Sequence, residues 1–268
     1  MKFNLILDLE EQYIKENQKV INEFAVSHNV MNSGNVRMKG RENVLVFTDS
    51  KSNITKWDGY AVIGIEHGKR IGGIPYVVEE IEDVDEAYMN LVYHRKHQIP
   101  MTIMETENLI LREMQEADAN DLCGLYEDKG AVRYIAPIHE VSEEKEYIKA
   151  YVKNMYGFYG YGMWSVVRKS DNRLIGRAGI EHRTLDGVVF CELGYFIGAK
   201  YQQMGYGYEA AKAVLEVAPR LGVKELVAYI HEKNTPSVKL VQKLGFSFWK
   251  SLWDGENFLI YKMKSFLE

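Results

Sequence analysis

A glycine-rich turn between a strand and a helix holds the residues of this chain that are best suited to chemistry. Gln202, Gly205 and Gly207 form the pattern Q-x-x-G-x-G, directly after an apolar stretch that ends at Ile197. Glycine lets a backbone approach a ligand closely. The helix that follows adds amides without intrahelical partners and the positive end of a dipole. These features predict a pyrophosphate-binding turn, although the same glycines could serve only a tight turn.

The composition favours a soluble globular protein without affinity for nucleic acid. The chain has 268 residues, 46% of them hydrophobic and 26% charged, with a net charge of −5. This length can hold two modest domains, and the acidic balance argues against the basic face of a nucleic-acid binder. Cys123 and Cys191 lie in apolar patterns, so we expect buried thiols in a reducing cytoplasm. The start of the chain reads as a strand rather than a leader, and we expect no membrane partner.

The first part of the chain alternates between predicted strands and helices. This order predicts a small parallel α/β layer over residues 1–97. Residues 95–106, around Pro100, are the expected linker, because the pattern changes after them. We expect strands at 3–8, 44–47, 60–65 and 76–78, helices at 9–28 and 84–94, and a loop at 29–42.

The second part, residues 105–268, combines an expected hairpin with the glycine turn and two well-marked helices. Asp186-Gly187 suits the hairpin turn. Gly222 suits the end of the helix that follows the glycine turn. We expect strands at 109–113, 162–168, 173–182, 188–197, 224–230, 246–253 and 257–264, and helices at 117–126, 142–157, 206–221 and 236–244.

Together, four features of residues 107–264 resemble the GNAT superfamily of N-acetyltransferases. They are the glycine turn, the order of predicted elements, the segment DNRLIGRAGI at 171–180, and Asn234-x-x-Ser237-x-x-Leu240-x-x-Lys243-x-Gly245-Phe246. The branch most similar is the ribosomal-protein N-terminal acetyltransferase type, which includes many small-amine acetylators. The resemblance implies an α+β domain with a mixed, mostly antiparallel central sheet, preceded here by a truncated Rossmann-like α/β domain.

The resemblance also implies acetyl-CoA as co-substrate and no metal. In such proteins the strand before the glycine turn separates from its neighbour and pairs with the pantetheine arm, here at Gly194 to Ile197. The amides of Met204 to Tyr208 would hold the pyrophosphate, and Asn234 would contact the pantetheine. The cofactor-binding residues expected in this way are Phe196, Ile197, Gln202, Gln203, Met204, Gly205, Tyr206, Gly207, Tyr208, Asn234 and Ser237.

Acetyl transfer needs one group that takes the amine proton and one that protonates the CoA thiolate. Glu192 lies on the same strand as Gly194 and could accept the amine proton, or it could orient the amine or pair with Arg177. By resemblance Ser237 is the expected proton donor, although a serine at a helix start can simply be a cap. Other candidates for the donor are Tyr195, Tyr229 and Tyr261.

Further aromatic and histidine residues could line the acceptor pocket. His182 and His231 lie at strand ends near the expected cleft, where a catalytic histidine is one alternative. We favour residues that line the pocket or lie at its solvated rim. Tyr156, Tyr159 and Trp164 could line it too, although for Trp164 we favour core packing. The expected acceptor is a small-molecule or peptide amine, and a homodimer is possible.

Residues 40–93 resemble a late sheet segment of the haloacid dehalogenase superfamily, through VLVFTDS at 44–50 and GYAVIGI at 59–65. The departures are Thr48 in place of an acid and Asp8-Leu-Glu10 in place of D-x-D. We therefore expect a non-catalytic domain, because a fold without its site does not carry function. Two alternatives stay open: residual phosphohydrolase activity through Asp8 and Asp49, and a non-catalytic CoA-sensing protein.

Overall fold

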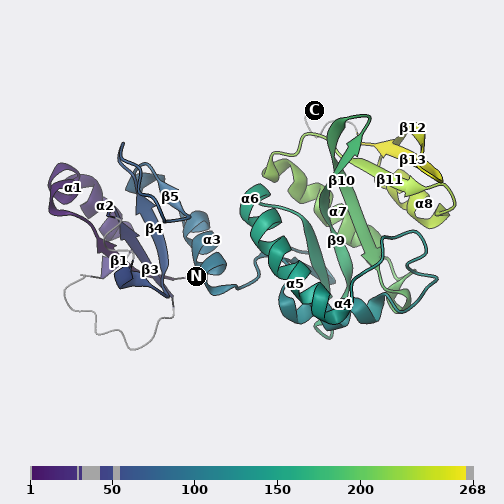
Figure 1. Cartoon of the computed structure of the whole chain (residues 1–268), viewed down its shortest axis with the longest axis horizontal. Helices are drawn as coiled ribbons and strands as arrows, with labels where there is room; N and C mark the ends of the chain where they lie inside the picture. The colour runs from purple at the N-terminus through teal and green to yellow at the C-terminus, as the bar shows by residue number, and fades with distance from the viewer. Residues whose placement is uncertain (1, 29, 32–42, 51–54, 264–268) are drawn as a thin grey trace. The chain divides into compact units, whose positions relative to one another are not determined.

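The computed structural model describes residues 2–28, 30–31, 43–50 and 55–263. The chain divides into two compact units, Met1–Ile99 and Pro100–Glu268 (Figure 1). Each unit has a hydrophobic core of its own. No helix within the described ranges is long and apolar enough to cross a membrane.

The first unit is a five-stranded parallel sheet with helices, as the alternating pattern predicts. Its strand order is β2-β1-β3-β4-β5. The central strand β3 is buried along its whole length, which is typical of a parallel sheet covered on both faces. The elements are β1 (Asn4–Asp8), α1 (Glu11–Glu16), α2 (Gln18–His28), β2 (Val30–Met31), β3 (Val44–Thr48), β4 (Ala61–Ile65), β5 (Val77–Val78) and α3 (Glu86–His97).

Two boundaries in this unit differ from the prediction. The helix predicted at 9–28 is interrupted at Asn17, whose backbone and side-chain nitrogens both donate to the Tyr13 carbonyl. Such side-chain competition for backbone groups is typical of asparagine. Strand β2, Val30–Met31, lies within the loop predicted at 29–42. The other residues of that loop lie outside the described residues.

The second unit is built on an eight-stranded sheet of order β12-β13-β11-β10-β9-β8-β7-β6. Neighbours are antiparallel except β10 and β11, which are parallel. This confirms the predicted mixed, mostly antiparallel sheet. Its strands are β6 (Thr102–Glu105), β7 (Leu109–Arg112), β8 (Met163–Arg168), β9 (Arg173–Leu185), β10 (Val188–Ile197), β11 (Val227–His231), β12 (Ser247–Trp253) and β13 (Asn257–Lys262), and its helices are α4 (Ala119–Leu125), α5 (Val141–Tyr151), α6 (Gly157–Tyr159), α7 (Tyr206–Val217) and α8 (Thr235–Lys243).

The linker predicted at 95–106 is wrong in part. Helix α3 continues to His97, and residues 102–105 form β6, which pairs antiparallel with β7. As an edge strand β6 is only half-buried, so its sequence lacks the apolar run by which a central strand is recognised. The end of the strand predicted at 257–264 also lies outside the described residues, at Lys264.

Helices cover both faces of the second sheet (Figure 1). On one face, which we call the acceptor face, Tyr126 at the end of α4 packs its ring 4.8 Å from that of Phe196 on β10. On the other, the donor face, a Cβ at Gly207 of α7 would lie 3.7 Å from Ile197 on β10 and 3.5 Å from Leu240 of α8. Successive strand residues point to opposite faces, so β10 presents Phe196 to α4 and Ile197 to α7 and α8.

Two glycines of the DNRLIGRAGI segment allow β9 to lie close to its neighbours. A Cβ at Gly176 would lie 2.0 Å from the Phe196 carbonyl oxygen, and one at Gly179 would lie 2.1 Å from the Gly162 carbonyl oxygen. Neither contact is possible for a larger residue without moving backbone. Gly176 therefore lets β9 lie close to β10 beside the glycine turn, and Gly179 lets β9 lie close to the start of β8.

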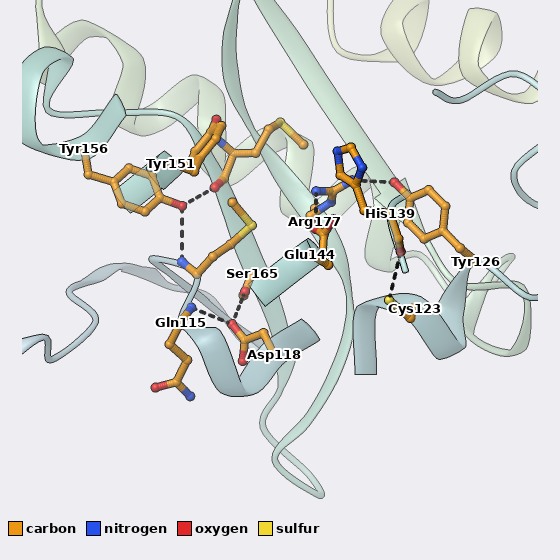
Figure 2. A network of polar contacts seen from close by, with 12 residues as sticks. Gln115, Asp118, Cys123, Tyr126, His139, Glu144, Tyr151, Tyr156, Ser165 and Arg177 are labelled. Atoms are coloured by element: carbon orange, nitrogen blue, oxygen red, sulfur yellow. Dashed lines mark hydrogen bonds and ion pairs between the residues drawn. The ribbon is translucent and has the colours of Figure 1, made fainter. Parts of the chain in front are cut away.

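The start of α4 is fixed to the sheet by a buried carboxylate. Asp118, which is 4% exposed, accepts two bonds from the Arg112 guanidinium at 2.7 Å. It also accepts the Ser165 hydroxyl at 2.7 Å and the Gln115 N–H at 3.1 Å (Figure 2). A buried charge needs such partners, and here they position α4 over the acceptor face.

The two cysteines are separate thiols, and both are half-buried. This confirms free thiols rather than a disulfide, whereas the expected burial holds only in part for Cys123 and Cys191. The Cys123 thiol donates to the His139 carbonyl at 3.5 Å.

Candidate active site

Strands β10 and β11 are paired at one position and then separate. Glu192 and Val227 are the matched residues. Beyond them β10 remains bonded to β9 as far as Ile197, and β11 remains bonded to β13 as far as His231. Each strand is thus held on its outer side only, and we call the gap between them the β10–β11 opening.

The backbone groups of Tyr195 and Ile197 face this opening. The Gly198 N–H donates to the Ile175 carbonyl on β9, and backbone groups alternate in direction along an antiparallel strand. Phe196 therefore bonds toward β9, whereas Tyr195 and Ile197 point away from it. The Gln202 side chain donates to the Ile197 carbonyl at 2.8 Å, which ties the glycine turn to the end of β10.

The glycine turn exposes amides and has a cation beside it. Gly205 has a φ of +89° and Gln203 one of +61°, conformations that favour glycine. Helix α7 begins at Tyr206, so its first amides have no intrahelical acceptor. The Lys243 ammonium lies 4.3 Å from the centre of the Tyr208 ring. Residues Gln202 to Gly205 are exposed, so this turn is open to an anionic ligand.

On the donor face the structure brings Tyr195, Asn234 and Ser237 together. Tyr195 donates its hydroxyl to the Ser237 carbonyl at 3.2 Å. Asn234 caps α8 by accepting the Ser237 N–H at 3.3 Å, as is typical of an N-cap residue. Burial raises the pKa of Tyr195 to about 12, so its hydroxyl keeps its proton at neutral pH. Ser237 thus lies in the first turn of α8, as predicted.

On the acceptor face Glu192 is bound by an arginine that the sequence did not single out. Its carboxylate, in a residue 8% exposed, accepts the Arg183 Nε at 2.6 Å. Burial raises the pKa of Glu192, and the Arg183 guanidinium and the Tyr229 N–H offset this only in part. Arg183, two residues after Glu181 on β9, meets Glu192 of β10 across the strand pair. No local sequence pattern predicts this pairing.

The predicted alternative that Glu192 pairs with Arg177 is wrong. Arg177 lies opposite Phe196, farther along the sheet. It donates to the Tyr126 hydroxyl at 2.5 Å, and its guanidinium is 3.9 Å from the buried Glu144 carboxylate. Figure 2 shows these three side chains converging from α4, α5 and β9.

The segment between α4 and α5 lies beside the β10–β11 opening. Tyr126 precedes it and packs on Phe196 of β10, while Tyr134 within it stacks on His231 of β11 at 4.7 Å. His231 accepts the Lys233 N–H at 3.0 Å, and its other ring nitrogen is 2.9 Å from Glu256. His231 is 8% exposed, so it supports this loop rather than standing at a solvated rim.

The other expected pocket residues divide between core and surface. Trp164 is fully buried, which confirms core packing, and Tyr156 is 2% exposed and bonds to the Met163 carbonyl. Tyr159 and His182 are exposed. Tyr229 stacks on Phe258, and Tyr261 is buried in the core.

No group of three metal-ligating side chains occurs among the residues that the structure describes. In the first unit Asp8 already accepts the Trp57 ring nitrogen at 2.5 Å and the Lys56 ammonium at 3.1 Å. Asp49 accepts the Glu10 N–H at 3.0 Å. Asp8 and Asp49, the two carboxylates named for a residual phosphohydrolase activity, therefore have partners within the chain.

Comparisons with known proteins agree with this geometry. A model of the acetyltransferase (GNAT) domain family matches residues 108–247. The uncharacterized protein YkkB of Bacillus subtilis is 25% identical over 169 residues, which is 62% of this chain and 97% of that protein. An uncharacterized N-acetyltransferase, p20, of Bacillus licheniformis is 28% identical over 150 residues, 54% of this chain and 83% of that protein.

A solved structure shows the same fold. It is the ribosomal-protein-S5-alanine acetyltransferase of Vibrio fischeri, which covers 61% of this chain and 97% of its own with a TM-score of 0.53 and 16% identity. GNAT acetyltransferases use acetyl-CoA as co-substrate and act on amines. Because the family model covers more than half of its 268 residues, the chain belongs to the GNAT acetyltransferase family and is an N-acetyltransferase that uses acetyl-CoA.

Proposed function

We propose that the chain transfers the acetyl group to a primary amine by direct attack, with both substrates bound at the β10–β11 opening. The single matched pair between β10 and β11 is the observation that carries this proposal. It leaves backbone groups of β10 open to a ligand. They lie between the glycine turn on the donor face and the buried Glu192 carboxylate on the acceptor face. Both small molecules and protein N-termini should be screened as acceptors. Protein N-termini are included because the Vibrio fischeri neighbour is named for a ribosomal protein.

Acetyl-CoA would enter from the donor face. Its pantetheine arm would pair with the Tyr195 and Ile197 backbone groups, and its pyrophosphate would lie on the amides of Met204 to Tyr208. Gln202 and Gln203 shape that turn, Lys243 adds a positive charge, and Asn234 lies where the arm passes α8. The Phe196 amide is turned toward β9, so an amide of Tyr195 or Ile197 would polarise the thioester carbonyl.

The amine would arrive from the acceptor face, where Glu192 can take its proton. A carboxylate whose pKa burial has raised is a better base near neutral pH than an ordinary one. On the donor face the Tyr195 hydroxyl is engaged with the Ser237 carbonyl. Tyr195 therefore positions α8, and the Ser237 hydroxyl is the proton donor to the thiolate. Base and acid lie on opposite faces of β10, so the amine and the CoA thiolate each meet their own proton-transfer group.

For the first unit we propose a truncated haloacid dehalogenase-like layer without phosphatase activity. Its strand order places Asp8 and Asp49 at adjacent strand ends, where such folds hold their sites, but both carboxylates are engaged. We expect no release of phosphate from p-nitrophenyl phosphate with magnesium. Release by the wild type that disappears in Asp49→Asn would contradict this. We place the enzyme in the cytoplasm because two free thiols fit a reducing compartment.

The pyrophosphate turn is tested with two matched substitutions. Asparagine and aspartate both tolerate a positive φ, and a Cβ at Gly205 meets nothing within 4 Å. We expect Gly205→Asp to weaken acetyl-CoA binding at least about tenfold relative to Gly205→Asn, because only aspartate repels the diphosphate. Isothermal titration calorimetry measures both. Equal affinities would show that the diphosphate lies elsewhere.

The role of Glu192 is tested by the pH dependence of turnover. As pH falls through the raised pKa of Glu192, the basic form is lost, so we expect kcat to fall on the acidic side. Glu192→Gln should lower kcat by about 10²- to 10⁴-fold, remove that acidic limb and leave acetyl-CoA affinity within about threefold of wild type.

Ser237→Ala serves as the contrasting variant in the same series. It should lower kcat at every pH and keep the acidic limb, because Glu192 is intact. An unchanged acidic limb in Glu192→Gln would assign the base to another group. A different outcome is that wild type and Glu192→Gln both bind acetyl-CoA but neither acetylates any amine of a broad panel. That outcome would favour a CoA-sensing role over the proposed acetyl transfer.

A further inference from the structure

Strand β9 carries a row of charged side chains on the acceptor face. Arg177, Glu181 and Arg183 are spaced by even numbers along a continuous strand, so they share one face. The strand register places Glu181 opposite Glu192 and Arg177 opposite Phe196. Glu181 therefore lies one strand away from the point at which the β10–β11 opening begins.

Both arginines of this row already have partners. Arg183 binds Glu192 at 2.6 Å and lies over the Tyr229 ring at 4.5 Å. Arg177 binds the Tyr126 hydroxyl and faces the Glu144 carboxylate. The positive charge on the acceptor face is thus engaged by groups of the chain itself.

Glu181 is different, because no hydrogen bond or ion pair holds its carboxylate within the part of the chain that the structure describes. Its side chain is half-buried. Burial first, and then the charge of Glu181, raise the pKa of Tyr147 on α5, so this carboxylate faces the tyrosines of α5. The charge of Glu181 also raises the pKa of Arg177 and of Arg183, so Glu181 lies within electrostatic reach of both. The three carboxylates of Glu144, Glu181 and Glu192 together exceed these two guanidinium groups by one negative charge.

A second observation is that two buried polar atoms on this face have no hydrogen bond. Glu144 is 1% exposed, and its Oε1 atom lies 3.9 Å from an Arg177 guanidinium nitrogen. Neither this oxygen nor the Arg177 Nε atom has a hydrogen-bond partner among the described residues. Buried oxygens are almost always paired in folded proteins. An incoming ammonium group carries three N–H donors and a positive charge, and it would offset the excess negative charge of Glu144, Glu181 and Glu192.

We propose that Glu181 binds the ammonium group of the acceptor and makes the enzyme selective for cationic amines. The inference rests on the proposed function, since it places the acceptor beside the β10–β11 opening. Glu181 would hold the charged amine, and Glu192 across the strand pair would take its proton.

Two coenzyme A thioethers of equal length test this without knowledge of the natural acceptor. S-(2-aminoethyl)-coenzyme A places an ammonium just beyond the sulfur, and S-propyl-coenzyme A places a methyl group there. We expect wild type to bind the aminoethyl analogue about tenfold more tightly by calorimetry. Glu181→Gln should remove this preference and leave the affinity for the propyl analogue unchanged, which also shows that the variant is folded. Glu192→Gln, which removes an equal charge on the neighbouring strand, is the comparison variant and should lower the preference less than Glu181→Gln does.

Each outcome decides a separate claim. If neither analogue binds wild type, the proposed acetyl-CoA site fails, and the inference fails with it. If both bind equally, or if the preference survives in Glu181→Gln, the site stands and the role of Glu181 is overturned. A preference lost in Glu192→Gln but kept in Glu181→Gln would assign the ammonium to Glu192 instead.

Discussion

The active site depends on a hydrogen-bonded strand pairing that stops after one matched position. Backbone groups left without partners in a buried place destabilise a protein by about 1–3 kcal/mol each, so a strand pair normally closes. Here β9 holds one strand and β13 the other, and the bond from Gln202 to Ile197 fixes the free end. The opening is thus built into the sheet, and a ligand with amide groups of its own can complete the pairing.

The alternation of side chains along β10 separates the two halves of the reaction. Glu192 and Phe196 point to the acceptor face, whereas Tyr195 and Ile197 point to the donor face. A single strand therefore carries a proton acceptor on one side and the contact to α8 on the other. Because both are fixed by the same backbone, small shifts of β10 would disturb both halves together. Gly176 allows β9 to lie against β10 at Phe196, a contact that a residue with a side chain would not allow without moving backbone.

Much of the fold follows from local patterns in the sequence. Apolar alternation predicts the strands, and the cap at Asn234 and the turn at Gly205 mark the starts of two helices. The same signals predict where the acetyl-CoA site lies. Strand β6 was missed because an edge strand is only half-buried, and the break at Asn17 was missed because it depends on one side-chain bond.

The acceptor side could not be predicted in the same way. The partners of Glu192 and Arg177 come from different elements, and no spacing along the chain encodes those pairings. Tyr134 and His231 meet because the segment between α4 and α5 lies beside two diverging strands. Glu181 has no motif at all, and its place emerges only when the strand register is known.

The most direct test of the account is residue-resolved amide hydrogen exchange of the protein with and without acetyl-CoA. If the pantetheine arm completes the open strand edge, the amides of Tyr195 and Ile197 should become protected when acetyl-CoA binds. The amides of Gly194 and Phe196, which face β9, should change little. Saturating acetyl-CoA that leaves Tyr195 and Ile197 as exchangeable as before would contradict the account, because the opening would then not be where the co-substrate binds.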